Sequence, residues 1–211
     1  MGNHKDHMKR IIRTLIICAA ITGIAIVSVH AVGKNDSVQT VAATRPSKWA
    51  EPITLAGVPN LHKVSDRLYR SAQPTSEGMA NLAAMGIKTV VNLRDRHSDL
   101  DEIGDLPLQA KRIDIFTGHM KDEYVKEFLA IVDDTSNAPV LVHCQHGADR
   151  TGTMCAMYRI LRQGWTPDEA IEEMKNGGYN YHSIWSNIPR FIRKSAARLG
   201  GKQTGDGLNN K

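Results

Sequence analysis

Cysteine is scarce in this chain of 211 residues, which contains three. Cys18 lies in an apolar segment near the N-terminus, and the other two, Cys144 and Cys155, stand eleven positions apart. Cys155 falls on an expected helix, whose rise would separate the two residues by about 16 Å, too far for a disulfide. The sequence therefore excludes a disulfide framework, and Cys155 is expected to be a small buried apolar residue.

Aromatic residues and net charge are also low. Phe, Trp and Tyr make up 5% of the chain, and the formal net charge is +5. Part of this excess belongs to the first 31 residues, where four basic residues stand against one acidic residue. With no stacking surface and no strong basic patch, the sequence does not predict a nucleic-acid partner.

No apolar run is long enough to cross a bilayer comfortably. The longest, Leu15–Val29, has about 15 residues, whereas a spanning helix needs about 20. It follows a basic head and ends at Ala31, the pattern of a secretory signal peptide that is cleaved after this residue. The alternative is an uncleaved membrane anchor. Both interpretations predict that the rest of the chain lies outside the cytoplasm, with membrane contact only through this segment.

The most informative stretch is Val140–Gly152, VLVHCQHGADRTG, in which an apolar run enters a short loop and a helical pattern follows. The loop opens with Cys144 and closes with Arg150. Gly147 lies at its middle, where a backbone curling around an anion needs a conformation that other residues resist. Loop amides and the positive end of the new helix attract an anion, and a guanidinium binds two of its oxygens. The pattern predicts a phosphate site.

Cys144 lies where the inward amides favour thiolate over thiol, so we expect it to attack phosphorus and form a thiophosphate intermediate. His143 is expected to hold the loop through a hydrogen bond, and Thr151 to donate its hydroxyl to the departing sulfur. Asp149 is unexpected beside Arg150, because a carboxylate repels phosphate, and it is predicted to turn outward and bond to loop amides or position Arg150. The residues expected around the phosphate are Gln145, His146, Gly147, Ala148 and Asp149, with Gln145, His146 and Ala148 at the rim.

The segment HCQHGADRTG resembles the HCxxGxxR[ST]G signature of cysteine-dependent protein phosphatases of the dual-specificity type. The segments LYRSAQP (Leu68–Pro74) and MYRILRQGW (Met157–Trp165) are similar to exported bacterial members, and the likeness extends over about residues 43–193. The resemblance implies a monomeric, cofactor-free, periplasmic phosphatase of protein phosphotyrosine, with phosphoserine and phosphothreonine as further substrates. It also implies a role in signalling or biofilm control, with a membrane signalling protein as the target.

Other functions stay open. The same chemistry could act on inositol phosphates or another small phosphorylated molecule, although the loop has no basic residue besides Arg150 to bind a highly phosphorylated ring. A non-catalytic phosphate-binding module would not need Cys144, Arg150 and Thr151 together. A sulfurtransferase also uses a cysteine loop, but the spacing to Arg150 suits phosphate better.

The proton donor for the leaving oxygen is harder to assign. Family members take it from an aspartate on the loop before the helix expected at Asp122–Asp133, and that position falls near Thr117 here. Asp122 is our prediction, with helix capping as the alternative; His119 and Asp114 are the next candidates. A weak acid would favour phosphotyrosine, because a phenol leaves more readily than an alkyl alcohol.

Some side chains outside the signature are candidates for the site. Arg70 is expected either beside the pocket or in a surface ion pair. The segment Tyr179–His182 and Trp185 are candidates for a further wall, although Trp165 and Trp185 are more typical of core anchors. No metal-ligand spacing connects the histidines His62, His97 and His182, and the cysteine mechanism needs no metal.

Strands alternate with helices early in the chain and helices dominate late, which predicts an α/β fold with a central, mostly parallel sheet flanked by helices. Strands are expected at 61–64, 68–71, 88–93, 112–116 and 140–142, and helices from 75 and at 100–103, 122–133, 151–163, 167–174 and 184–199. The predicted organisation is 1–31 signal peptide or anchor, 32–59 linker and extended arm, 60–199 catalytic domain and 200–211 disordered tail.

Overall fold

The computed structural model describes residues 45–201. The predicted signal peptide or anchor, the first part of the linker and residues 202–211 of the predicted tail lie outside the described residues. No helix within the described part is long and apolar enough to pass through a membrane.

The centre of the fold is a six-stranded sheet with the strand order β1-β2-β3-β6-β4-β5. Strands β3, β6, β4 and β5 run parallel to one another, whereas β2 pairs antiparallel with both β1 and β3 at one edge. This confirms the predicted α/β fold with a mostly parallel sheet. The strands are β1 (Glu51–Pro52), β2 (His62–Lys63), β3 (Leu68–Ser71), β4 (Thr89–Arg94), β5 (Gln109–Ile115) and β6 (Val140–His143).

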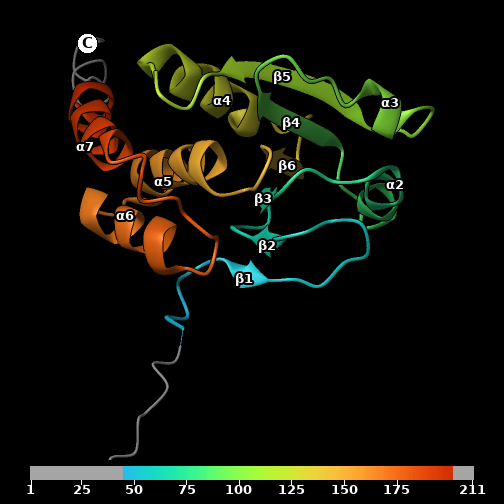
Figure 1. Ribbon diagram of the computed structural model, residues 1–211, viewed down its shortest axis with the longest axis horizontal. Helices are drawn as coiled ribbons and strands as arrows, with labels where there is room; N and C mark the ends of the chain where they lie inside the picture. Colours follow the sequence, from blue (N-terminus) through green and yellow to red (C-terminus); the bar gives the residue numbers. More distant parts are fainter. Residues whose placement is uncertain (1–44, 202–211) are drawn as a thin grey trace, which may run out of the picture. The chain divides into compact units, whose positions relative to one another are not determined.

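Helices cover both faces of the sheet. In Figure 1, α2 and α3 lie at the right of the view and α4 to α7 at its left. Side-chain alternation along the central strand β6 explains this arrangement, since Val140 and Val142 pack with α4 to α7 while Leu141 packs with α2 and α3. The helices are α2 (Ser76–Ala84), α3 (Leu100–Ile103), α4 (Asp122–Asp133), α5 (Asp149–Gln163), α6 (Pro167–Asn176) and α7 (Asn187–Gly200).

The carboxyl ends of the four parallel strands meet at one edge of the sheet. Ser71 at the end of β3 and Asn92 in β4 are both aligned with His143 at the end of β6. Arg94, the last residue of β4, is aligned with Ile115, the last residue of β5. The loop that opens with Cys144 therefore starts at the edge where ligands of parallel sheets usually bind.

The start of the last helix differs from the prediction by three residues. Helix α7 begins at Asn187, not at Ile184. Pro189 has no amide hydrogen and is tolerated only in a first helical turn, which sets the start just before it. Ile184 and Trp185 consequently belong to the loop before the helix, and both face a surface cavity that is described below.

A buried carboxylate ties the N-terminal arm to the helices. Glu173 of α6 is 4% exposed and accepts hydrogen bonds from Arg159 of α5, from the backbone amide of Ala50 and from the hydroxyl of Tyr179. Arg45 also donates to the Tyr179 hydroxyl, at 2.9 Å. Because an unpaired buried charge is costly, these bonds fix the arm, α5 and α6 together.

His62 supplies a test of the packing around Tyr179. It is 8% exposed and its ring lies edge-on to that of Tyr179, with 4.7 Å between centroids. Burial lowers the pKa of His62 to about 4. A histidine in the unfolded chain titrates near 6.5. Between this pH and pH 4 the unfolded state binds a proton at His62 and the folded state does not, so the free energy of unfolding decreases as the pH falls.

We therefore expect the wild type to lose about 2 kcal/mol more of its free energy of unfolding between pH 7 and pH 5 than the variant His62→Gln. Urea unfolding at the two pH values measures this difference. His119→Gln, at an exposed position, is the control and should keep the wild-type pH dependence. Equal losses in the wild type and His62→Gln would contradict the assignment.

Candidate active site

A cavity of about 400 Å³ opens at the carboxyl edge of the sheet, above the β6–α5 loop. From this loop and the first turn of α5 it receives Gln145, His146, Asp149 and Arg150. Its other lining residues are Arg94, Asp95, Thr117, His182, Ile184 and Trp185. The structure thus brings together most of the residues expected around the phosphate.

The thiol of Cys144 lies at the start of this loop and is 2% exposed. Both Cys144 and Cys155 are free thiols, as their spacing predicts. Burial raises the pKa of Cys155 to about 11, so its thiol stays protonated at neutral pH. Thr151 follows on α5, and its hydroxyl is buried with no hydrogen-bond partner. The predicted bond from Thr151 to the cysteine sulfur is therefore not formed here, but the hydroxyl is free to make one.

Arg150 closes the loop, and only one of its guanidinium nitrogens is engaged. Nη1 lies 3.2 Å from a carboxylate oxygen of Asp95 and 3.4 Å from the carbonyl oxygens of Leu93 and Ile115. Within residues 45–201, no acceptor lies in hydrogen-bonding range of Nε or Nη2. Two neighbouring guanidinium donors of this kind can bind two oxygens of a phosphate.

The middle of the loop is held from beneath by Arg70. Its Nη2 donates to the carbonyl oxygen of Gly147 at 2.6 Å, and its guanidinium stacks on the ring of Tyr179 at 3.5 Å. Arg70 is 2% exposed, so it is not a surface ion-pair partner. Its bond to the loop agrees with the other expectation, that it lies beside the pocket, although it does not line the cavity. No carboxylate in the described part of the chain pairs with it. This buried cation supports the loop and adds positive charge below it.

Gly147 and Ala148 are buried, which corrects the expectation that Ala148 lies at the rim. The methyl group of Ala148 is buried and Gly147 has no side chain, so these two residues offer a ligand only their backbone groups. Gly147 has a φ of +69°, the left-handed conformation expected at mid-loop. A Cβ there would lie 2.5 Å from the carbonyl oxygen of Ser71 and 2.6 Å from the amide nitrogen of Ala72, so the loop packs directly on the end of β3.

His143 connects the loop to a second buried polar group. Its Nε2 lies 2.7 Å from a carboxylate oxygen of Asp99, and its Nδ1 lies 3.4 Å from the carbonyl oxygen of Cys144. Burial of Asp99 disfavours its ionised form, but hydrogen bonds from His143 and Gln73 outweigh this cost and lower the pKa of Asp99. The pair is fully buried, which suits the predicted role of His143 in holding the loop.

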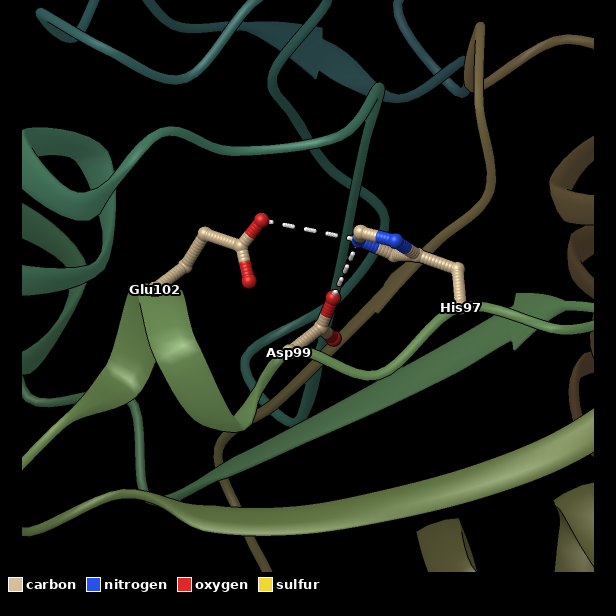
Figure 2. A group of neighbouring side chains, drawn as sticks. All are labelled: His97, Asp99 and Glu102. Atoms are coloured by element: carbon tan, nitrogen blue, oxygen red, sulfur yellow. Dashed lines mark ion pairs between the residues drawn. The ribbon is translucent and has the colours of Figure 1, made fainter.

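Figure 2 shows that His97, Asp99 and Glu102 form one cluster, which sequence reasoning missed. Nε2 of His97 lies 3.6 Å from an oxygen of Asp99 and 3.6 Å from an oxygen of Glu102. Such a group could hold a metal ion, since its ligand atoms lie within 4.8 Å of one another. Asp99, however, already accepts bonds from Gln73, Asn92 and His143, as expected of a structural cluster that orients His143.

Asp149 has a partner that the sequence did not reveal. Its two carboxylate oxygens accept hydrogen bonds from the backbone amide of His182 at 3.0 Å and from Nδ1 of His182 at 2.7 Å. We expected Asp149 to bond to amides of its own loop or to position Arg150. Instead, it holds the segment between α6 and α7 against the cavity. The predicted wall is formed by His182 and Trp185, while Tyr179 is buried beneath.

The candidates for the proton donor lie elsewhere. Asp122 does not line the cavity, and its carboxylate accepts bonds from Ser195 at 2.6 Å and from Arg198 at 2.6 and 2.7 Å. The bond from Arg198 is the main cause of its lowered pKa, the opposite of what a proton donor needs. His119 lines a separate cavity with Arg198, and Asp114 is exposed and paired with Arg112. The geometry thus does not support the prediction of Asp122.

Thr117 lines the cavity, at the position where the resemblance expects the aspartate of family members. Threonine has no acidic group and cannot replace that aspartate as the proton donor. Arg94 and Asp95 also line it and were missed. They directly follow the apolar run of β4. The rule that ligands bind at the carboxyl ends of parallel strands would have pointed to them.

Comparison with known proteins gives a consistent result. Residues 54–187 match a family model described as "DSP-PTPase phosphatase fused to NAD+ Kinase". The chain is similar to the dual specificity protein phosphatase TpbA of Pseudomonas aeruginosa, with 34% identity over 153 residues that cover 72% of this chain and 69% of that protein. It is also similar to the inositol diphosphatase DSP2 of Oryza sativa, with 25% identity over 67% of this chain and 72% of that protein.

Solved structures agree with these sequence relationships. The crystal structure of P. aeruginosa TpbA superimposes with a TM-score of 0.64 at 32% identity, covering 73% of this chain and 99% of that one. TpbA in complex with pTyr gives a TM-score of 0.63 at 31% identity, again over 73% and 99% of the two chains. The catalytic domain of the PP-IP phosphatase SIW14 from S. cerevisiae, at 20% identity, shares the fold with a TM-score of 0.60 over 72% of this chain and 96% of that one.

The close packing of Gly147 leads to a prediction about anion binding. In Gly147→Ala the new methyl group must push the loop off the end of β3, so we expect the variant to lose the rise in thermal unfolding temperature that phosphate or vanadate gives the wild type. Thermal unfolding with and without the anion measures this effect.

Gly164→Ala is the matched control, because Gly164 has almost the same φ, +71°, with nothing within 4 Å of an added Cβ. This variant should lose about 1 kcal/mol of its free energy of unfolding, because alanine disfavours the left-handed backbone conformation. Phosphate or vanadate should raise its thermal unfolding temperature as much as that of the wild type. A Gly147→Ala variant that still responds to phosphate like the wild type would show that the loop does not form the site.

Proposed function

Because the chain belongs to the DSP-PTPase phosphatase family, we propose that it hydrolyses phosphomonoesters through Cys144, with protein phosphotyrosine as the main substrate. One observation carries this proposal. Cys144 opens a loop whose last residue, Arg150, lines a cavity of about 400 Å³ and keeps two guanidinium donors unengaged. A nucleophile and a phosphate-binding fork at the same loop are the parts that phosphoryl transfer through sulfur requires.

The first step forms a bond between the Cys144 sulfur and phosphorus while the bond from phosphorus to the leaving oxygen breaks. Arg150 binds two phosphate oxygens, and the loop amides and the N-terminus of α5 stabilise the charge on them. Water then attacks phosphorus, and the sulfur departs as a thiolate. The free hydroxyl of Thr151 supplies a hydrogen bond to that sulfur, and the buried pair of His143 and Asp99 keeps the loop in place.

The mouth of the cavity favours an aromatic substrate. Ile184 and Trp185 line it, and Ile184 is 81% exposed. Phe116 is 63% exposed, and both its ring and that of Trp185 lie within 4 Å of a Cβ built on Gly118, so these aromatic side chains are neighbours. Exposed apolar side chains around a polar cavity suit a phenyl ring joined to phosphate. The complex of the related TpbA with pTyr supports the same substrate.

A second candidate substrate is an inositol phosphate. The curated relative from Oryza sativa is named an inositol diphosphatase, and Arg94 gives the cavity a second cation that the loop sequence does not show. Against this, Asp95 and Asp149 line the same cavity and would repel additional phosphates. The balance of charge therefore favours a substrate with one phosphate.

A substrate panel tests the proposal. We expect turnover of phosphotyrosyl peptides at least about 10-fold faster than of phosphoseryl peptides or inositol phosphates, because the mouth is apolar and the cavity has little net charge. Cys144→Ser should lower turnover by roughly 10³-fold or more. Rapid acid quench of the wild type with radiolabelled substrate should trap phosphate on Cys144.

Cys155→Ser is the matched control and should keep wild-type turnover, since this buried thiol stays protonated. Faster turnover of inositol phosphates would transfer the main function to the second candidate. Binding of phosphopeptide without any turnover by the wild type would indicate a phosphate-binding module instead of an enzyme.

We propose further that the enzyme works outside the cytoplasm on a phosphorylated membrane signalling protein, as the predicted leader at residues 1–31 supports. Expression of the tagged full chain in a bacterial host should place activity in the periplasmic fraction. Mass spectrometry should find a mature chain that starts at Val32. A chain of full mass in the membrane fraction would indicate the anchor, and full-length soluble protein in the cytoplasm would contradict export.

A further inference from the structure

We propose that His182, oriented by Asp149, is the proton donor to the leaving oxygen of the substrate. The inference rests on the proposed phosphatase function. It names a donor from a segment that follows the signature loop by 30 positions, not from the loop where family members have their aspartate.

The need for such a residue follows from the cavity itself. Thr117 stands where the usual aspartate would be, and Asp122 is held by Ser195 and Arg198 outside the cavity. Of the two carboxylates that line the cavity, Asp95 is ion-paired with Arg150, and Asp149 accepts two bonds from His182. Neither carboxylate is available to protonate a leaving group.

The geometry of His182 suits proton transfer. Its Nδ1 donates to Asp149 at 2.7 Å, which fixes both the ring orientation and the position of one ring proton. The bond from its backbone amide to the other oxygen of Asp149 fixes the segment as well. An imidazole held through Nδ1 by a buried carboxylate presents Nε2 as an acid or base, as in other catalytic Asp–His pairs.

The location of His182 completes the argument. The side chain is 45% exposed and lines the same cavity as Arg150, the residue that follows Asp149 on the first turn of α5. Within the described residues, Nε2 of His182 has no hydrogen-bond partner. Histidine is also the side chain whose ordinary titration range lies nearest neutral pH, so it can hold a proton and release it in the same cycle.

His182 gives up one proton in the first step of the proposed reaction and regains one in the second. When the bond from phosphorus to the leaving oxygen breaks, that oxygen keeps the electron pair and takes the proton from Nε2, so the imidazolium becomes neutral imidazole. In the second step Nε2 takes a proton from the attacking water as the water oxygen bonds to phosphorus and the sulfur departs as a thiolate. The imidazolium is restored and phosphate is released.

His146 is the other imidazole at this position, and its ring lies edge-on to that of His182 with 5.3 Å between centroids. No hydrogen bond orients the ring of His146 in the described part of the chain, so it lacks the fixed geometry of His182. The charged or titratable groups that face His182 are thus Asp149 and His146, with Tyr181 beside it in sequence and Arg94, Asp95 and Arg150 across the cavity.

The test compares substrates whose leaving groups differ in basicity. His182→Gln should lower kcat/KM for phenyl phosphate by about 10²-fold, because this constant reports the first step and phenoxide needs a proton to leave. For p-nitrophenyl phosphate, whose leaving group needs little help, we expect kcat/KM to change by less than about 5-fold. The second step is common to both substrates and does not enter this comparison.

Asp149→Asn tests the positioning residue. It should lower kcat/KM for phenyl phosphate more than for p-nitrophenyl phosphate, because the ring of His182 loses the carboxylate that orients it, while vanadate still raises the thermal unfolding temperature. His119→Gln, outside the cavity, is the control and should match the wild type on both substrates.

Equal losses on the two substrates, or an unchanged rate on phenyl phosphate, in a His182→Gln variant that folds and binds vanadate would overturn this inference alone. A wild type that hydrolyses neither substrate would overturn the proposed function together with it, so the two failures are distinguishable.

Discussion

The active-site geometry depends on one buried hydrogen bond, from the guanidinium of Arg70 to the carbonyl oxygen of Gly147 at 2.6 Å. A loop that points its amides toward a ligand turns some carbonyl oxygens away from it, and those oxygens need donors in the protein interior. Arg70 supplies the donor for Gly147. Burying a cation without a carboxylate partner is costly, and the stacking on Tyr179 offsets part of the cost. The remaining positive charge lies under the loop that we propose as the phosphate site.

The support for Arg70 reaches back to the N-terminal arm. Tyr179 is held by Arg45 and by Glu173, and Glu173 also binds Arg159 of α5 and the amide of Ala50. The arm, the central helix and the floor of the active site therefore share one buried polar network. Breaking a buried network leaves unpaired charges, so a change in the arm is expected to reach the phosphate loop through Tyr179.

Charge in the cavity is nearly balanced, which shapes the chemistry that it supports. Arg150 and Arg94 are set against Asp95 and Asp149, and each carboxylate is engaged by a specific partner. A carboxylate next to Arg150 would repel a phosphate if it faced the ligand. The Asp149 carboxylate is instead bonded to His182. These two bonds occupy both oxygens of the Asp149 carboxylate and fix the orientation of the His182 imidazole at the wall of the cavity.

The sequence by itself determined the features that depend on neighbours along the chain. The strand, loop and helix of Val140–Gly152 could be predicted because the apolar run, the mid-loop glycine and the Cys-x5-Arg spacing are local, and the helix at Asp122–Asp133 because its apolar stripe is periodic. Only the tertiary structure decided which distant residues meet that loop. The strand order places Arg70 under Gly147 and Asp95 beside Arg150, and the path of the segment between α6 and α7 places His182 against Asp149. No local pattern encodes these contacts, because they arise from packing of the sheet and helices between residues more than thirty positions apart.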